Sequence, residues 1–313
     1  MTKARDHKKI QTSLNKAVKL ALKNNKGEHA TYIPELAQMP LEKTGVSVTL
    51  NDGTKIQAGD CEEFYVSLQS AAKVPLLIGL LEEFGQEQVF KWINVEPTGR
   101  GFAAIDYSNR FSNLPSNPMI NAGAIALCSH IPGSTRDQQI EWLDKWMEKL
   151  FNIPLKINHK MYTSELENSD RNLSLAYLMR SNHVIKGDVA SILKNYVALC
   201  AYETTVEHAS YLPMLLANRG CDENGNRVLT EETVKCVTSI MATCGLYNET
   251  GLFMVHTGMP AKSSVSGLIL AVAIGHGGVA TFNPRLTIKG GSVRGQIMLQ
   301  EISKDLEWHF ASL

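Results

Sequence analysis

The sequence predicts an α+β fold in which one antiparallel sheet, built from both ends of the chain, is flanked by helices and interrupted by an all-helical insertion. Alternating apolar and polar residues near the N-terminus and short apolar runs near the C-terminus are both typical of strands. Helical periodicity fills the stretch from approximately 71 to 245. No internal repeat and no linker rich in Pro, Gly or Ser divides the sequence. We therefore expect a single domain over 1–313, with sheet-containing parts at approximately 1–70 and 246–313.

Apolar periodicity locates the individual elements. Apolar residues three or four apart are typical of an amphipathic helix, and strict alternation is typical of a strand. The expected helices cover 8–24, 70 onward, 138–151, 172–180, 188–200, 206–217, 231–243 and 292–310. The expected strands cover 46–50, 55–57, 252–256, 268–274 and 279–282. Asn51-Asp52-Gly53 separates the first two strands, and these residue types favour a tight hairpin turn.

The composition is that of an ordinary globular protein whose charges balance. Apolar residues make up 44% of the 313 residues, and 31 Lys plus Arg residues match 31 Asp plus Glu residues. Proteins that bind nucleic acid usually carry a basic excess, so we expect no nucleic acid partner. The longest apolar run, 267–275, is too short to span a bilayer, so we expect no membrane partner.

The cysteine pattern and the N-terminal segment indicate the cellular compartment in which we expect the protein. The six cysteines are scattered, with no C-x-x-C pair and no close Cys/His cluster, which argues against a disulfide framework and against a zinc site. The nine histidines include no H-E-x-x-H motif. The N-terminus leads into a charged helical pattern, unlike a signal peptide. We therefore expect a cytoplasmic protein with reduced thiols.

Ser70-Ala71-Ala72-Lys73 is the strongest local indication of chemistry. Residues three apart share one face of a helix, so Lys73 can reach the Ser70 hydroxyl. A serine hydroxyl becomes a useful nucleophile when a neighbour takes its proton, and a lysine can do so when burial lowers its pKa. A helix N-terminus at Ser70 also favours developing negative charge. A capping serine followed by a surface lysine is the competing interpretation of this short motif.

A second element, Lys262-Ser263-Ser264, directly precedes an apolar segment over 265–274. In acyl-transfer enzymes that carry S-x-x-K, a K-[ST]-G triplet lies on the strand beside the nucleophile. There it adds a positive charge and lets the backbone approach the oxyanion. Ser264 replaces the glycine here and adds only a small side chain. The two elements, in the expected order, favour a serine that is acylated.

Seven segments in a fixed order carry a resemblance to one known family. They read YIPELA at 32–37, SLQSAAKV at 67–74, NPMINAGAI at 117–125, SDRN at 169–172, MATCGLY at 241–247, GMPAKS at 258–263 and SVRG at 292–295. In these segments the chain resembles the glutaminases that are related to serine β-lactamases and penicillin-binding proteins, over nearly its whole length. The departures are Ser264 and Gly290-Gly291-Ser292, where the family tends to have Gly-Asn-Ser.

The resemblance implies a fold, an activity and partners. The fold is β-lactamase/transpeptidase-like, and 1–313 is then one catalytic domain. The activity is hydrolysis of L-glutamine to L-glutamate and ammonia, without a metal or an organic cofactor. The expected small-molecule partner is therefore L-glutamine. Members of the family form homo-oligomers, so the resemblance also implies a homo-oligomer, either a tetramer or a dimer.

The resemblance also implies the catalytic roles. Ser70 attacks the side-chain amide and Lys73 accepts its proton, while the backbone N–H groups of Ser70 and Val265 form the oxyanion hole. Tyr247 is similar to the tyrosine that passes a proton to the leaving ammonia and activates water, and Tyr32 lines the same pocket. Tyrosine has an unperturbed pKa of about 10, so nearby lysines must stabilise the Tyr247 anion if it is a base at neutral pH. Apart from the family, both tyrosines are typical of half-buried core aromatics.

Glutamine presents an ammonium and a carboxylate on one carbon, so its pocket needs a carboxylate partner and neutral or cationic donors. Glu165 resembles the family's carboxylate for the ammonium. The implied substrate-binding set is Ser70, Asn121, Glu165, Asn172, Tyr196, Tyr247 and Val265. The residues alone allow other interpretations, in which Asn121 is a helix N-cap, Glu165 a loop charge and Asn172 a first-turn residue of the helix after Ser169.

Two alternatives to a glutaminase remain open. A penicillin-recognising serine hydrolase of the same fold acts outside the cytoplasm, and the missing signal-peptide features count against it. A non-catalytic sensor keeps a glutamine pocket without turnover. The presence of Ser70, Lys73 and Tyr247 counts against the sensor, since binding alone needs no such set.

Overall fold

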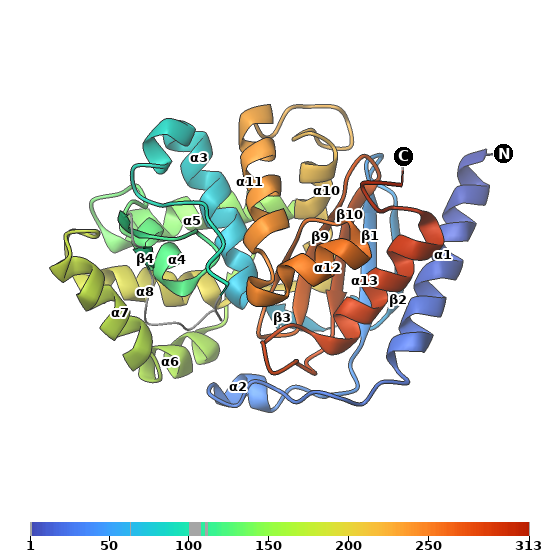
Figure 1. Ribbon diagram of the computed structural model, residues 1–313, viewed down its shortest axis with the longest axis horizontal. Coiled ribbons are helices and arrows are strands. Elements are labelled where there is room, and N and C mark those ends of the chain that lie inside the picture. The colour runs from blue at the N-terminus through green and yellow to red at the C-terminus, as the bar shows by residue number, and fades with distance from the viewer. Residues whose placement is uncertain (1, 63, 100–107, 110–111, 313) are drawn as a thin grey trace.

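A five-stranded antiparallel sheet is the frame of the protein, in a computed structural model that describes residues 2–62, 64–99, 108–109 and 112–312. In spatial order its strands are β2 (Lys55–Gly59), β1 (Gly45–Leu50), β10 (Gly277–Phe282), β9 (Leu268–Ala273) and β8 (Ala261–Ser263). β1 pairs with β10 so that Ser47 lies opposite Ala280. The prediction of one sheet assembled from both chain ends is confirmed (Figure 1).

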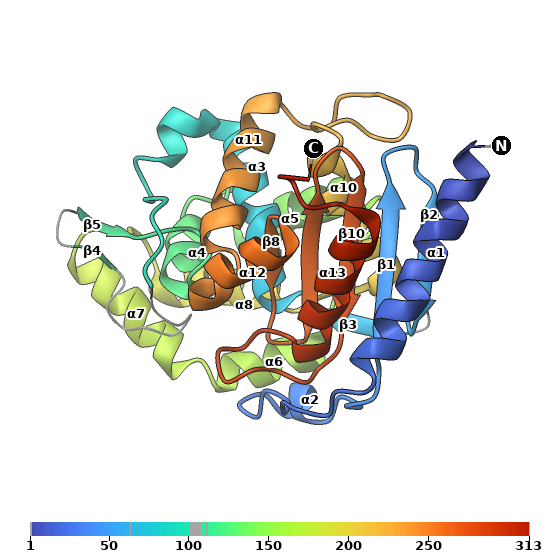
Figure 2. The ribbon, with the colours of Figure 1, turned by 45° about the vertical axis from the view of Figure 1, so that its right-hand side comes forward.

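Helices cover both faces of the sheet because its inner strands are apolar on both sides. All six residues of β9 are buried, and successive side chains point to opposite faces. Leu270 packs into a core shared with the helical part of the chain. Ile269 packs into a second core shared with α1 (Thr2–Ala21) and α13 (Val293–Leu306). Figure 2 shows these two helices side by side, next to β1 and β2.

The middle of the chain is mainly helical, as expected. Its helices are α3 (Lys73–Val89), α4 (Asn121–Cys128), α5 (Arg136–Phe151), α6 (His159–Glu167), α7 (Asp170–Ser181), α8 (Val189–Cys200), α9 (Val206–Ala209), α10 (Tyr211–Ala217) and α11 (Glu231–Cys244). The shorter helical elements are α2 (Pro34–Ala37) and the 3₁₀ turns η1 (Gln69–Ala72) and η2 (Tyr247–Glu249). A small three-stranded sheet consists of β3 (Tyr65–Ser67), β7 (Tyr202–Thr205) and β6 (Lys156–Ile157). A further strand pair consists of β4 (Ser108–Asn109) and β5 (Ser112–Pro115).

The strand predicted over 252–256 is wrong, because these residues lie in helix α12 (Thr250–Thr257). A short apolar run does not distinguish a buried strand from a helix. Here only Phe253 points into the core, while Leu252 and Val255 are 68% and 72% exposed. Gly258 ends the helix in the left-handed conformation with φ 61°, which glycine adopts without strain.

Other boundaries differ from the prediction as well. The first helix, expected over 8–24, is Thr2–Ala21. The helix expected over 206–217 is divided into α9 and α10, since Pro213 cannot continue a helix from the preceding turn. The final helix ends at Leu306 rather than at 310, where Glu307 adopts φ 60°. Lys262 and Ser263 lie on the edge strand β8 itself, so a turn over 264–267 separates the triplet from β9.

Across the described residues, no helix combines the length and the apolar character that a bilayer span requires.

Arg294 of α13 joins the two ends of the chain. Its side chain is fully buried, and it donates to the segment that connects α1 with β1. The acceptors include the Asn24 carbonyl at 2.8 Å, Asn25 Oδ1 at 2.8 Å, Glu42 Oε2 at 2.9 Å and Thr44 Oγ1 at 3.1 Å. A guanidinium satisfies this many acceptors because it carries five N–H donors in one plane.

Arg294→Met should therefore lower the free energy of unfolding by about 1 to 3 kcal/mol, since it leaves the buried Thr44 hydroxyl and the partly buried Asn24 carbonyl without this donor. Urea denaturation measures this loss. Lys16→Met is the matched control, because Lys16 also joins α1 to α13 through Glu301 and Asp305 but is largely exposed. An equal loss in the two variants would contradict a special role for the buried arginine.

Candidate active site

The turn that carries Ser70 lies where the helical part meets the sheet. It begins directly after β3 as the 3₁₀ turn η1 and runs into α3, whose first residue is Lys73. The Leu68 carbonyl accepts the N–H of Ala71 at 2.9 Å and closes the turn. Gln69 has φ 46°, a left-handed conformation that is strained for a residue with a Cβ. Strain of this kind persists only where surrounding contacts enforce it.

Lys73 and Ser70 are in contact, as the S-x-x-K spacing predicts. Lys73 Nζ lies 3.2 Å from Ser70 Oγ, 3.2 Å from the Met119 carbonyl oxygen and 2.7 Å from Asn121 Oδ1. The lysine side chain is 1% exposed, and the serine is 7% exposed. The interpretation of a surface lysine after a capping serine is therefore wrong. Burial lowers the pKa of the Lys73 amine to about 8.

This geometry suits both charge states of Lys73. An ammonium has three protons, one for each of the three acceptors. When the amine is neutral, two protons still reach Met119 and Asn121, and the lone pair is left to accept the hydrogen of Ser70. With a pKa of about 8, roughly a tenth of the amines are neutral at pH 7. The arrangement can therefore remove a proton from Ser70.

Tyr247 contacts the same pair from the other side. Its hydroxyl is buried beside Ser70, and its ring centroid lies 4.3 Å from Lys262 Nζ and 5.8 Å from Lys73 Nζ. Lys262 is fully buried and donates to the Gly245 carbonyl at 3.0 Å and the Ser263 carbonyl at 2.6 Å. Burial raises the pKa of Tyr247 despite the two lysines. The phenol therefore keeps its proton at neutral pH.

Glu165 is a buried helix residue rather than a loop charge. It lies on α6, is 7% exposed, and accepts a hydrogen bond of 2.9 Å from Gln69 Nε2 on the nucleophile turn. Burial raises the pKa of its carboxyl to about 7, while hydrogen bonds from Gln69 and Cys200 oppose that shift. A carboxylate in this position favours a cationic group beside Ser70.

Asn121 connects the lysine to Asn172. It is the first residue of α4 rather than its N-cap, which is Ile120. Asn121 Nδ2 donates to Asn172 Oδ1 at 3.1 Å, and Asn172 lies in the first turn of α7 after Ser169, as predicted. The nearby Gly123 is required, since a Cβ there would lie 2.0 Å from the carbonyl oxygen of residue 117. A small residue thus allows the close backbone approach expected around Asn121.

The remaining predicted residues border the same cluster. Tyr196 lies on α8 and is 2% exposed, and burial raises its pKa. Tyr32 is 47% exposed, yet burial of its hydroxyl and the charge of Glu165 raise its pKa. Val265 lies in the turn after β8 and is 6% exposed. Within the part of the chain that the structure describes, the backbone N–H groups of Ser70 and Val265 have no acceptor.

Comparison with known proteins places this geometry in a family. The family model described as Glutaminase matches residues 27–310. The chain belongs to the glutaminase family. A glutaminase of Legionella pneumophila strain Philadelphia 1 is 48% identical over 299 residues, which cover 95% of this chain and 96% of that protein. Glutaminase 2 of Clostridium perfringens is 36% identical over 284 residues, which cover 90% and 93% of the two chains.

Solved structures of glutaminases share the fold. The probable glutaminase YbaS superposes with a TM-score of 0.92 at 30% identity, covering 96% of this chain and 97% of its own. The Bacillus subtilis glutaminase YbgJ, in covalent complex with 5-oxo-L-norleucine, superposes with a TM-score of 0.85 at 29% identity, covering 96% and 98%. The prediction of a β-lactamase/transpeptidase-like fold is confirmed.

The sequence missed two members of the cluster in this glutaminase. Gln69 binds Glu165, and Cys200 lies beside Glu165 and Tyr196. Gln69 could have been suspected, because it directly precedes the nucleophile within the SLQSAAKV segment. Cys200 gave no such signal, since a lone cysteine on an apolar helix is typical of a core residue.

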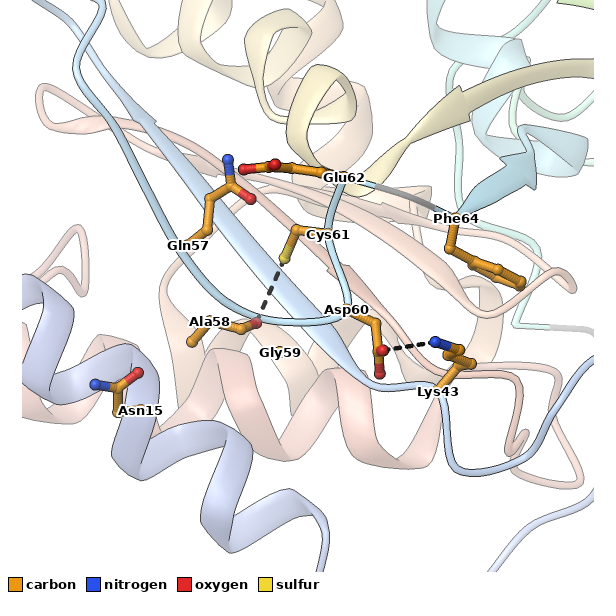
Figure 3. A pocket seen from close by; sticks show the side chains of 9 residues that line it. All are labelled: Asn15, Lys43, Gln57, Ala58, Gly59, Asp60, Cys61, Glu62 and Phe64. Carbon is orange, nitrogen blue, oxygen red and sulfur yellow. Dashed lines mark hydrogen bonds and ion pairs between the residues drawn. The ribbon is translucent and has the colours of Figure 1, made fainter.

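A surface hollow lies apart from this cluster, between α1 and the loop that follows β2 (Figure 3). It has a volume of about 530 Å³ and is lined by Asn15, Lys43, Gln57, Ala58, Gly59, Asp60, Cys61, Glu62 and Phe64. Burial raises the pKa of the Cys61 thiol to about 12, so it is not a thiolate nucleophile. Within the described ranges, no group of three His, Cys, Asp or Glu side chains is placed to hold a metal ion.

Replacing Lys73 by Met tests the burial of its amine without any substrate. The native pKa of about 8 lies below the usual 10.5, so the unfolded state binds more protons between these pH values. Wild-type stability should therefore rise with pH from 8 to 10.5, by about 3 kcal/mol in total. Methionine carries no titrating amine, so the variant should lack this rise. In urea denaturation, the unfolding free energy of Lys73→Met minus that of wild type should therefore fall by about 3 kcal/mol from pH 8 to pH 10.5. Ser70→Ala, which keeps the amine, is the control, and a pH-independent difference for Lys73→Met contradicts the lowered pKa.

Proposed function

We propose that this glutaminase hydrolyses L-glutamine to L-glutamate and ammonia through a covalent acyl-enzyme on Ser70, with Lys73 as the general base. The observation that carries the proposal is the buried Lys73 amine, 3.2 Å from Ser70 Oγ and with a pKa near neutrality. An amine in this state accepts the serine proton at physiological pH, and an exposed lysine does not. The covalent complex of the Bacillus subtilis relative supports covalent chemistry in this family.

In acylation, Ser70 Oγ attacks the side-chain amide carbon of glutamine while its proton moves to Lys73 Nζ. The carbonyl oxygen becomes negative and is stabilised by the unpaired N–H groups of Ser70 and Val265. The C–N bond then breaks, and the nitrogen leaves as ammonia after receiving a proton. Tyr247 delivers that proton, since its hydroxyl is protonated and lies beside Ser70, and it recovers one from Lys73.

Deacylation follows the same path with water in place of the serine. Water attacks the Ser70 ester and gives up a proton towards the neutral Lys73 amine, by way of the Tyr247 hydroxyl. The same two N–H groups stabilise the second oxyanion. Ser70 leaves with a proton, and L-glutamate is released. No step requires Tyr247 to be an anion at rest, which agrees with its raised pKa.

Recognition of glutamine follows from the charges around the nucleophile. We assign Glu165 to the α-ammonium, because a buried carboxylate binds a cation strongly where water is excluded. Asn121, Asn172 and Tyr196 supply neutral donors for the α-carboxylate. Tyr32 closes one side of the pocket with its hydroxyl turned inward.

The proposal extends to the organisation of the protein. We propose that 1–313 is one catalytic domain, because the site needs Ser70 and Lys73 from one part of the chain and Val265 from the other. A cytoplasmic location is supported by the six cysteines, all of which are free thiols. A homo-oligomer, either a dimer or a tetramer, is supported by exposed apolar side chains such as Leu252 and Val255 on α12.

Ser70→Ala should reduce ammonia release from glutamine by about 10⁴-fold or more, because no other group replaces the nucleophile. Circular dichroism should show an intact fold. The assay should include asparagine and a chromogenic β-lactam, with glutamine expected as the preferred substrate. Retained turnover in Ser70→Ala would remove this serine from the mechanism. Glutamine binding to wild type without ammonia release would favour a sensor, and β-lactam cleavage would favour a penicillin-recognising hydrolase.

The KM for glutamine should depend on the ionisation of Glu165. The carboxyl has a pKa of about 7, so it is neutral at lower pH and cannot pair with the ammonium. The KM of the wild type should therefore rise as pH falls below 7. Glu165→Gln should raise the KM by about tenfold or more at pH 8, with little pH dependence. Glu167→Gln, on the exposed side of the same helix, is the control, and an unchanged KM in Glu165→Gln would overturn the assignment.

A further inference from the structure

Ser264 occupies the position that is glycine in the K-[ST]-G triplet of S-x-x-K enzymes. It does not extend into solvent, because its side chain is 1% exposed. Its Oγ lies 2.8 Å from the carbonyl oxygen of Leu68, which is 196 residues away in sequence and two residues before Ser70. The extra hydroxyl of this chain therefore connects the turn after β8 to the turn that carries the nucleophile.

The direction of each hydrogen bond around Ser264 follows from counting protons. A carbonyl cannot donate, so the single proton of Ser264 goes to Leu68. Ser266 Oγ lies 2.9 Å from Ser264 Oγ and must then be the donor in that pair. The Ser266 N–H also donates to Ser264 Oγ at 3.3 Å. The Ser264 hydroxyl is thus fully engaged and has one fixed orientation.

The hydrogen bond from Ser264 to Leu68 joins two turns, and each turn is closed by hydrogen bonds of its own. On the nucleophile side, the Leu68 carbonyl that receives Ser264 also accepts the Ala71 N–H, and the strained Gln69 and the nucleophile lie between these two residues. On the other side, the Ser264 N–H donates to the Leu268 carbonyl at 2.9 Å. The Ser264 carbonyl in turn accepts the Gly267 N–H at 3.0 Å. These bonds close the turn that carries Val265.

We infer that Ser264 is a positioning residue, whose hydroxyl holds the Val265 turn against the Ser70 turn and so sets the spacing of the two oxyanion-binding N–H groups. It acts through Ser70 and Val265 and does not touch the substrate. A glycine at this position lacks the contact. The inference rests on the proposed acyl-enzyme mechanism. Oxyanion stabilisation depends steeply on donor placement, because loss of one donor alone costs about 10²- to 10³-fold in rate.

Ser264→Ala tests the inference, with Ser303→Ala as the matched control. Ser303 lies on α13, far from the site, and is also a buried serine that is 2% exposed. Its hydroxyl donates to the backbone carbonyl of Thr257 at 2.6 Å. Ser264→Ala should lower kcat for glutamine by about tenfold or more, with the KM and the inhibition by L-glutamate unchanged within about twofold. Ser303→Ala should leave kcat unchanged at a similar loss of thermal stability. Ser264→Thr, which keeps the hydroxyl, should recover most of the lost kcat.

The outcomes separate this inference from the proposed function. Equal kcat in wild type and Ser264→Ala overturns the positioning role, as does an equal fall in Ser264→Ala and Ser303→Ala. Reaction with 6-diazo-5-oxo-L-norleucine, followed by mass spectrometry of the peptide that contains Ser70, reports on the mechanism itself. An adduct on Ser70 in the wild type, formed more slowly in Ser264→Ala, supports both proposals. No adduct on Ser70 in the wild type overturns the acyl-enzyme, and the positioning role with it.

Discussion

The site depends on keeping one amine out of water. Lys73 is buried among groups that satisfy its protons, and burial brings its pKa down to about 8. A fully solvated lysine holds its proton too tightly to activate an alcohol, and a buried amine without acceptors costs too much free energy to keep. The Met119 carbonyl and Asn121 resolve this conflict, because each accepts a hydrogen bond from the amine in either charge state. The amine therefore remains in place when it exchanges a proton with Ser70.

The fold explains how such a site is enclosed. The sheet comes from both chain ends, and the helical part packs on one face, so the junction between them is lined by segments far apart in sequence (Figure 1). Two residues beside the nucleophile, Gln69 and Tyr247, adopt φ 46° and 55°. The Gln69 side chain donates to Glu165, and the Tyr247 carbonyl accepts a hydrogen bond from Thr250 Oγ1 at 2.9 Å. Favourable contacts in the rest of the fold thus offset the strain at these two residues and maintain the geometry of the site.

Much of this could be predicted from the sequence, for identifiable reasons. Alternation located β1, and extended apolar runs located β9 and β10. The spacing of three placed Ser70 and Lys73 on one helix face, and the second element and the family resemblance favoured their contact. The sequence pattern gave the wrong element type for α12, where a strand was predicted, because its short apolar run is mostly exposed and tertiary packing sets its structure. Nor does any local pattern report the pKa of Tyr247, because that pKa is raised by the burial of its hydroxyl in the folded chain. The contact between Ser264 and Leu68 joins residues 196 positions apart, and no local pattern reports on it.

The central claim, that Lys73 is a buried and partly neutral amine at physiological pH, can be measured directly. Protein labelled with ¹³C at the lysine ε-carbon gives a resonance for each lysine, and the one missing from Lys73→Met belongs to Lys73. Its chemical shift, followed from pH 6 to 11, should titrate with a midpoint near 8. A midpoint at the ordinary value of 10.5 would contradict the account, because the amine would then be fully protonated whenever Ser70 needs a base.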